Sequence, residues 1–215
     1  MDKIFNEYKI ESNENIITLK DKLEETQICA ILEIYDKYII IQELNKCNKK
    51  SGTETLMKIE EFGRILGKEK IKLYDTSQIK IICEDKTIEI SLALLKILST
   101  GRTWYNTKGY FDINQDKINT HIQEIIHLTM NDFLDRCLEE YKKRHLDIIK
   151  SINEKKFIDE TFRHDSIVID FFIDINKVIN INTDCIKLDK ICRLMNFIKN
   201  SNFVNYGFLF IKILE

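Results

Sequence analysis

The first half of the chain alternates between short apolar segments and one longer segment with helical spacing. The short segments have the apolar pattern of β-strands and cover residues 15–19, 28–34, 37–44 and 70–74. Only Tyr35 and Asp36 separate the second of these strands from the third. So short a connection predicts an antiparallel hairpin.

A helix is expected between 37–44 and 70–74. Apolar residues at positions 56, 59, 62 and 65/66 recur with helical spacing over 54–66, and Gly67 is a suitable stop. A strand, a helix and a second strand in this order form a crossover. We therefore expect 70–74 to lie parallel to 37–44.

A second hairpin and a helix are expected next, and after residue 111 the chain becomes charged and mostly helical. Residues 78–90 predict a second hairpin with its turn at 84–86, and Ser91 is a suitable N-cap for a helix over 92–106. The remaining expected elements are helical structure over 116–162, a strand at 166–173, a helix at 184–199 and a strand at 207–214.

These elements predict an α/β (α+β) fold with a central mixed sheet and flanking helices. A mostly helical region with two strands follows this sheet. We place the boundary near residue 112, which gives regions 1–111 and 112–215.

Composition indicates a globular chain without a strong charge. Of 215 residues, 44% are hydrophobic and 32% charged, and 33 basic residues nearly balance 35 acidic ones to give a net charge of −2. The sequence therefore carries no strong nucleic-acid signal. Its apolar runs are far shorter than the roughly 20 residues of a membrane span, and residues 1–5 do not resemble a signal peptide. We expect a soluble cytoplasmic protein without a membrane partner.

The metal-ligating residue types follow no metal-binding pattern. Six cysteines include no C-x-x-C pair, and the four histidines lack the i, i+4 spacing of a helical zinc site. We therefore expect no metal site. In an intracellular protein we also expect reduced thiols, packed mostly as small apolar residues.

Proline is absent, although ordinary usage of about 5% predicts roughly eleven residues in a chain of this length. Isoleucine, lysine and asparagine are abundant instead. Their codons are rich in A and T, which indicates an AT-rich genome.

One loop has the residues of an anion site. Lys49, Lys50, Ser51, Gly52 and Thr53 lead directly into the helix expected over 54–66. The free N–H groups at a helix start attract anions, and a glycine lets a phosphate approach the backbone closely. The alternative is a solvated loop with an ordinary capping glycine.

A second segment runs from Gly101 through Trp104 and Tyr105 to Gly109-Tyr110. Together the two segments resemble the GNAT family of acetyl-CoA-dependent N-acyltransferases over about residues 15–111. In that family an R/Q-x-x-G-x-G/A loop cradles the CoA pyrophosphate, and a later helix ends in A-x-x-x-Y-x-x-x-G-F. Lys49 and Gly52 match the loop, and Tyr105 matches the family tyrosine.

The sequence also departs from the family. Glu54 stands where the second Gly or Ala belongs, and Lys49 replaces a planar Arg or Gln. Leu98 stands where the family often has Asn, and the hairpin at 78–90 is an insertion. Similar divergent proteins are encoded by large AT-rich DNA viruses, so the resemblance also implies a viral origin.

The resemblance implies transfer of an acetyl or other acyl group from acetyl-CoA to an amine of unknown identity. Tyr105 is the expected general acid, and the general base is left open between Glu33 and Glu43. The expected cofactor-binding residues are Leu44 and Lys46 for pantetheine, and Lys49, Ser51, Gly52, Thr53 and Thr55 for the pyrophosphate.

Two non-enzymatic alternatives stay open. The chain could be a GNAT-derived scaffold that lost its cofactor and binds a protein partner through 112–215, as a virion or assembly protein does. It could also be a plain α+β interaction protein whose resemblance to the family is accidental.

Overall fold

The computed structural model describes residues 3–45, 47, 51–75, 77–83, 86–144, 148–162, 164–181, 184–204 and 209–214. The chain forms two compact units that alternate along the sequence. Unit 1 contains Met1–Asp75, Gly109–Ile113 and Phe208–Glu215, and unit 2 contains Thr76–Lys108 and Asn114–Gly207. The boundary expected near residue 112 falls within Gly109–Ile113, where the chain briefly returns to unit 1.

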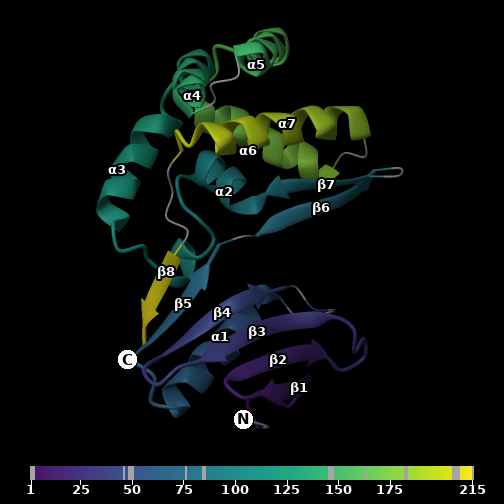
Figure 1. Ribbon diagram of the computed structural model, residues 1–215, viewed down its shortest axis with the longest axis vertical. Coiled ribbons are helices and arrows are strands. Elements are labelled where there is room, and N and C mark those ends of the chain that lie inside the picture. The colour runs from purple at the N-terminus through teal and green to yellow at the C-terminus, as the bar shows by residue number, and fades with distance from the viewer. Residues whose placement is uncertain are drawn as a thin grey trace. The chain divides into compact units, whose positions relative to one another are not determined.

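A six-stranded mixed sheet forms unit 1 (Figure 1). Its strands lie in the order β1 (Tyr8–Asn13), β2 (Ile16–Asp21), β3 (Ile28–Ile34), β4 (Tyr38–Leu44), β5 (Lys70–Tyr74) and β8 (Leu209–Ile213). Only β4 and β5 are parallel, with Tyr38 opposite Lys70 and Ile41 opposite Leu73. The predicted antiparallel pairing of 28–34 with 37–44 is confirmed, as is the parallel pairing of 37–44 with 70–74.

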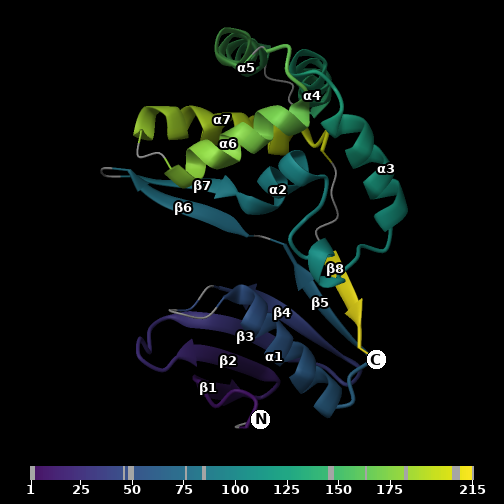
Figure 2. The same ribbon diagram turned by 180° about the vertical axis from the view of Figure 1, so that it is seen from behind.

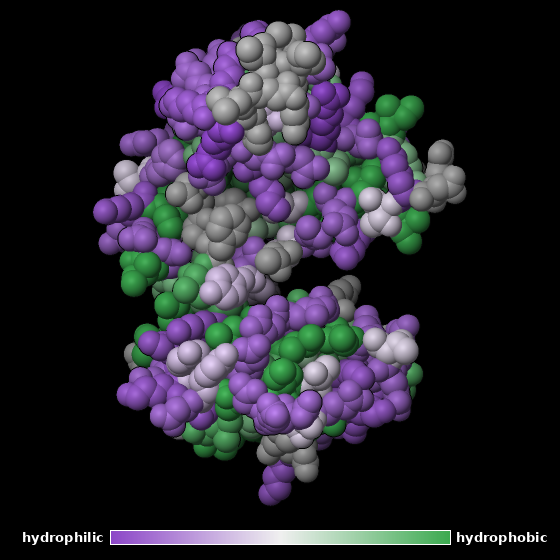
Figure 3. Space-filling model, in the orientation of Figure 1, coloured by the Kyte–Doolittle hydropathy of each residue, from purple (hydrophilic) through white to green (hydrophobic). Residues whose placement is uncertain are grey.

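Helix α1 (Gly52–Ile65) covers one face of this sheet (Figures 1 and 2). Its apolar positions Leu56, Ile59 and Phe62 are buried, as are the alternate residues of the strands that face the same core. The opposite face is more polar, and Figure 3 shows it with a hydrophobic group among hydrophilic side chains. This division follows the alternation of side chains along each strand.

A glycine in α1 permits a close approach to the last residues of the chain. A Cβ on Gly63 would lie 2.6 Å from Leu214 Cδ1 and 3.5 Å from Ile39 Cδ1. A larger residue at this position would make the end of the Leu214 side chain shift.

In the part of unit 2 that the structure describes, six α-helices and one hairpin pack around a separate apolar core. The hairpin consists of β6 (Gln78–Cys83) and β7 (Lys86–Ser91), and the helices are α2 (Leu92–Thr100), α3 (Gln115–Ile126), α4 (Met130–Arg144), α5 (Ile148–Thr161), α6 (Val168–Ile181) and α7 (Cys185–Ser201). Helix α2 is almost wholly apolar and buried, which places it at the centre of this core. None of the described helices combines the length and the apolar content that crossing a membrane requires.

The predicted strand at 166–173 is wrong, because residues 168–173 form the beginning of α6. The run of Ile, Val and Phe resembles a buried strand, yet a short apolar run does not distinguish a strand from a buried helix. The spacing of the buried residues decides for a helix, since Val168, Phe172, Ile175 and Ile179 recur every three or four positions.

Two other expectations about secondary structure need correction. The helix expected over 92–106 ends at Thr100, because Gly101 adopts a left-handed conformation with φ of 72° and donates its N–H to Ile97. Strand β1 was not expected, since only Tyr8 and Ile10 give it an apolar character.

The expectation of reduced thiols is also wrong for four of the six cysteines. Cys29 is joined to Cys47 within unit 1, and Cys83 is joined to Cys185 within unit 2. Each pair is distant in sequence, with separations of 18 and 102 residues. The expectation rested on an intracellular location, whereas these two pairs are brought together by the fold.

We predict that replacing both members of the second disulfide, Cys83→Ser with Cys185→Ser, lowers the free energy of unfolding by about 2–5 kcal/mol. The cross-link closes a long loop, so its loss enlarges the unfolded ensemble. Urea unfolding followed by circular dichroism measures the effect. Added reductant should abolish the difference from the wild type, and a difference that persists would place the effect in packing instead.

Candidate functional site

The candidate anion site lies where β4 leads into α1, and the chain's own groups occupy this helix start. Ser51 is the N-cap, and its Oγ accepts a hydrogen bond from the Glu54 N–H at 3.3 Å. In return, Glu54 Oε2 accepts from the Ser51 N–H at 2.7 Å and from Ser51 Oγ at 3.0 Å. These reciprocal bonds form a capping box.

The capping box changes what the helix start can bind. The N–H groups of Glu54 and Thr55 lie 3.1 and 3.3 Å from the Ser51 carbonyl oxygen, so they and the Ser51 N–H all have acceptors within the chain. The Glu54 carboxylate brings a negative charge to the same place. A helix start already occupied by an anionic side chain is a poor site for a second anion.

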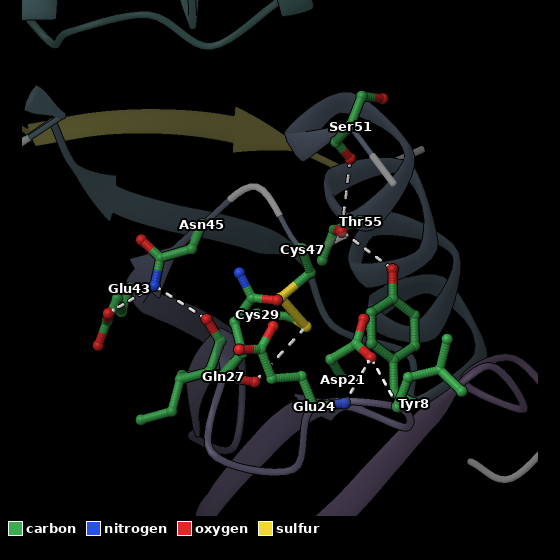
Figure 4. Close-up of a disulfide and its surroundings, with 12 residues drawn as sticks. Tyr8, Asp21, Glu24, Gln27, Cys29, Glu43, Asn45, Cys47, Ser51 and Thr55 are labelled. Carbon is green, nitrogen blue, oxygen red and sulfur yellow. Dashed lines mark hydrogen bonds between the residues drawn. A yellow bond between two sulfur atoms is a disulfide. The ribbon is translucent and has the colours of Figure 1, made fainter. Parts of the chain in front are cut away.

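The other end of the connection is held by β3. Leu44 is half-buried and pairs with Ala30 at the end of β4. Asn45 donates from Nδ2 to the Ile28 carbonyl oxygen at 3.0 Å and to Glu43 Oε1 at 2.6 Å. Figure 4 shows these contacts beside the Cys29–Cys47 disulfide, which fixes Cys47 to β3.

The expected cofactor-binding residues divide into three groups. Gly52 and Thr53 are the first residues of α1, and Ser51 caps it. Thr55 is fully buried, so its side chain faces the protein and not a ligand. Lys46 and Lys49 lie outside the described residues.

Thr55 instead connects α1 to the beginning of the chain. Its Oγ1 lies 2.9 Å from the Tyr8 hydroxyl and donates to the Ser51 carbonyl oxygen at 3.5 Å (Figure 4). Burial raises the pKa of the Tyr8 phenol, although the hydrogen bond to Thr55 acts in the opposite direction. Tyr8 therefore stays protonated at neutral pH and serves as a structural hydrogen-bonding group.

Tyr105, the expected general acid, belongs to unit 2, whereas the loop at 44–55 belongs to unit 1. It lies after α2, in the turn before the short 3-10 helix Asn106–Lys108. Its side chain is only 7% exposed and contacts Trp104 edge to face, with ring centroids 4.8 Å apart. Tyr105 is therefore a packed residue within its own unit.

The other residues of the second motif have structural roles. Gly101 ends α2, and Gly109 adopts a φ of 80°. Tyr110 is fully buried in unit 1, where its hydroxyl donates to Glu60 Oε1 at 3.1 Å. The motif therefore begins in unit 2 and ends in unit 1.

The two candidates for the general base lie on neighbouring strands. Glu33 accepts from the Tyr35 hydroxyl at 2.8 Å, and this bond raises the pKa of that phenol. Glu43 accepts from Asn45, as described above. Both carboxylates belong to unit 1 and hold local contacts, so neither is distinguished as a base.

The two free cysteines lack the properties of a nucleophile. Cys137 is fully buried, and burial raises the pKa of its thiol. Burial is also the main cause that raises the pKa of Cys192. Activated cysteines have a lowered pKa and an accessible sulfur.

Among the residues that the structure describes, one group has the atoms to hold a metal ion. It consists of Asp21, Cys29 and Cys47, whose ligand atoms lie within 4.8 Å of one another. Sequence reasoning missed it, because the three residues are separated along the chain and no spacing rule connects them. The pairing of β2 with β3 is what places Asp21 near Cys29.

Comparisons with protein families, with curated proteins and with solved structures find no significant match. The resemblance to the acyltransferases and the viral origin therefore stay predictions. The α+β architecture, with its mixed six-stranded sheet, is established by the structure itself.

We predict that Glu54→Ala destabilises the protein by about 0.5–2 kcal/mol, because it removes the carboxylate side of the capping box. Thermal unfolding followed by circular dichroism measures the change. Glu61→Ala is the matched control, since Glu61 is an exposed glutamate on the same helix. Equal effects of the two substitutions would show that the capping box contributes nothing.

Proposed function

We propose that this protein is a non-catalytic binding or assembly protein built on an acyltransferase-like scaffold. The observation that carries the proposal is the capping box at the start of α1, where the resemblance would place the CoA pyrophosphate. Glu54 occupies this start with its own carboxylate, 2.7 Å from the Ser51 nitrogen.

Electrostatics supports this choice. Two like charges 4 Å apart repel by about 1 kcal/mol in water and about 4 kcal/mol at an effective dielectric constant of about 20. A diphosphate at this helix start meets that repulsion and also displaces a cap of about 1 kcal/mol. A working cradle offers free N–H groups instead.

The environment of Tyr105 supports the same choice. A general acid must reach the departing thiolate within hydrogen-bond distance. Tyr105 is buried against Trp104 in unit 2, and its position in the packing is that of an anchoring aromatic residue.

Acyl transfer from acetyl-CoA to an amine is the second candidate function. It is favoured by the connection β4–α1–β5, because a strand, a loop and a helix in this order are what the resemblance implies for a CoA site. The described pairing of β4 with β5 ends at Ile41 and Leu73, while β4 continues to Leu44. If the protein is an acyltransferase, the backbone near Leu44 would hold pantetheine.

A surface for assembly lies at the edge of the unit 1 sheet. Phe111, Ile113 and Ile213 are 53%, 87% and 65% exposed. They line a hollow of about 510 Å³, together with Arg64 and Lys212. We name the surface formed by these five residues the edge patch. Exposed groups of large apolar side chains mark interaction sites, and edge strands are the places where sheets associate.

The occupant that we assign to the edge patch is a second copy of this chain. The backbone of β8 is only partly covered on its outer side, where Phe111 and Ile211 exchange N–H···O bonds of 2.9 Å. In an isologous contact, the edge patch of one copy packs against the edge patch of the other. The patch falls largely within 112–215, the region expected to bind a protein partner.

We predict that millimolar acetyl-CoA leaves the melting temperature of the wild type unchanged. A ligand at one hundred times its dissociation constant stabilises the folded state by about 2.7 kcal/mol, which a thermal-shift experiment detects. ADP serves as the control for unspecific effects of a phosphorylated compound. A shift with acetyl-CoA but not with ADP would favour the acyltransferase.

We predict that the wild type sediments as a dimer and that Ile113→Lys with Ile213→Lys makes it a monomer. The new charges would repel one another across a contact that pairs the edge patch with itself. Leu23→Lys is the matched control, since Leu23 is 90% exposed in unit 1 but does not line the hollow. A monomeric wild type at every concentration would contradict the assignment.

A further inference from the structure

Asp21, Cys29 and Cys47 form a buried cluster of three metal-ligating side chains in unit 1 (Figure 4). Both sulfur atoms belong to residues that are fully buried, and Asp21 is only 5% exposed. Asp21 ends β2, Cys29 lies on β3, and Cys47 follows β4. Three neighbouring segments of the sheet therefore each contribute one potential ligand.

The carboxylate is held in place before any ion arrives. Asp21 Oδ1 accepts hydrogen bonds from the N–H groups of Leu23 at 2.7 Å and Glu24 at 3.1 Å. Metal-binding side chains are oriented by such outer contacts, which keep the ligand geometry without the metal. Here the turn after β2 supplies these hydrogen bonds to Asp21.

The backbone separation of the two cysteines suits a shared ion as well as a disulfide. Their Cα atoms are 5.4 Å apart. Once the S–S bond is broken, rotation about each Cα–Cβ bond can separate the sulfurs while both reach a common ion at about 2.3 Å.

Charge explains why the two thiols would lose their protons only when an ion binds. Two thiolates and a carboxylate would place three negative charges in a buried space, which is unfavourable without a partner. The disulfide removes two of these charges. A divalent cation compensates the two negative charges of the thiolates.

We propose that, after reduction of the Cys29–Cys47 disulfide, Cys29, Cys47 and Asp21 bind a Zn²⁺ ion. A dithiol reductant donates two electrons and two protons to the disulfide, becomes a cyclic disulfide itself and leaves two thiols. Zn²⁺ then binds both sulfurs and displaces their two protons to solvent, with a water molecule as the fourth ligand. The disulfide and the metal therefore exclude each other, since both use the same two sulfur atoms.

The ligand set favours zinc over the other common divalent cations. Thiolates are soft ligands, whereas Mg²⁺ and Ca²⁺ prefer several oxygen atoms. Three protein ligands and one water complete the four-coordinate geometry that Zn²⁺ adopts in proteins.

The test uses Co²⁺ as a spectroscopic probe and Zn²⁺ as its competitor, on the full chain before and after treatment with dithiothreitol and removal of the reductant under argon. Reduced wild type should show the thiolate-to-cobalt charge-transfer band, which Zn²⁺ then abolishes. Oxidised wild type should show no band. A reduced wild type without the band would overturn the proposal.

Three variants locate the ion. Cys29→Ser with Cys47→Ser should abolish the band. Cys83→Ser with Cys185→Ser removes the same number of thiols from the other disulfide and should retain it. Asp21→Asn keeps the Oδ1 acceptor for the turn but removes the charge, and it should weaken cobalt binding at least about tenfold. If the Cys83 and Cys185 variant lost the band while the Cys29 and Cys47 variant kept it, the assignment would be wrong.

Differential alkylation read by mass spectrometry keeps the proposal testable if a variant does not fold. In reduced wild type, Zn²⁺ should slow the labelling of Cys29 and Cys47 relative to the metal-free protein. The labelling of Cys137 and Cys192 should not change. Equal labelling of Cys29 and Cys47 with and without zinc would contradict binding by these residues.

Discussion

The packing of α1 against the sheet is the constraint on which the rest of unit 1 depends. Because β4 and β5 are parallel, the chain must cross from the end of one strand to the beginning of the other, and α1 makes this crossing. Its buried residues Leu56, Ile59 and Phe62 each contribute about 1.5–3 kcal/mol through removal of apolar surface from water. The same helix positions the candidate site, because this site lies at the first turn of α1, which follows β4 in the chain.

A buried carboxylate on α1 then organises the parts of unit 1 that come from the second half of the chain. Glu60 accepts from the Tyr110 hydroxyl at 3.1 Å and from Lys212 Nζ at 2.9 Å. A charged group in such a place is tolerated only when hydrogen bonds and an opposite charge compensate it. Residues 109–113 and 209–213 are therefore held to α1 by a polar contact as well as by strand pairing.

The sequence predicted the regular elements well where periodicity was strong. Both hairpins, α1 and β5 follow from apolar spacing and short connections, and they lie where we expected them. Helix α6 could not be distinguished from a strand at 166–173, because a run of Ile, Val and Phe satisfies either geometry. The two disulfides depend on which segments meet in space, which the spacing of cysteines alone does not determine.

The sequence identified the residues of the candidate site but not the hydrogen bonds that they form. Ser51 and Glu54 have the S-x-x-E spacing of a capping box, and the same residues lie in the loop that resembles a pyrophosphate cradle. Sequence alone could not decide whether Glu54 turns toward Ser51 or away from it. The hydrogen bonds now answer this, since the carboxylate accepts from both the main chain and the side chain of Ser51.

The connection between β4 and α1 is therefore fixed at both ends by the chain itself. Asn45 and Cys47 hold the end near β4, and the capping box holds the end at the helix. At this helix start the N–H groups of Ser51, Glu54 and Thr55 already have acceptors within the chain, whereas a cradle for a diphosphate keeps its donors free until the ligand binds. The capping box therefore argues for a scaffold that presents surfaces, and the disulfide beside Asp21 marks the part of this connection whose chemistry can still change.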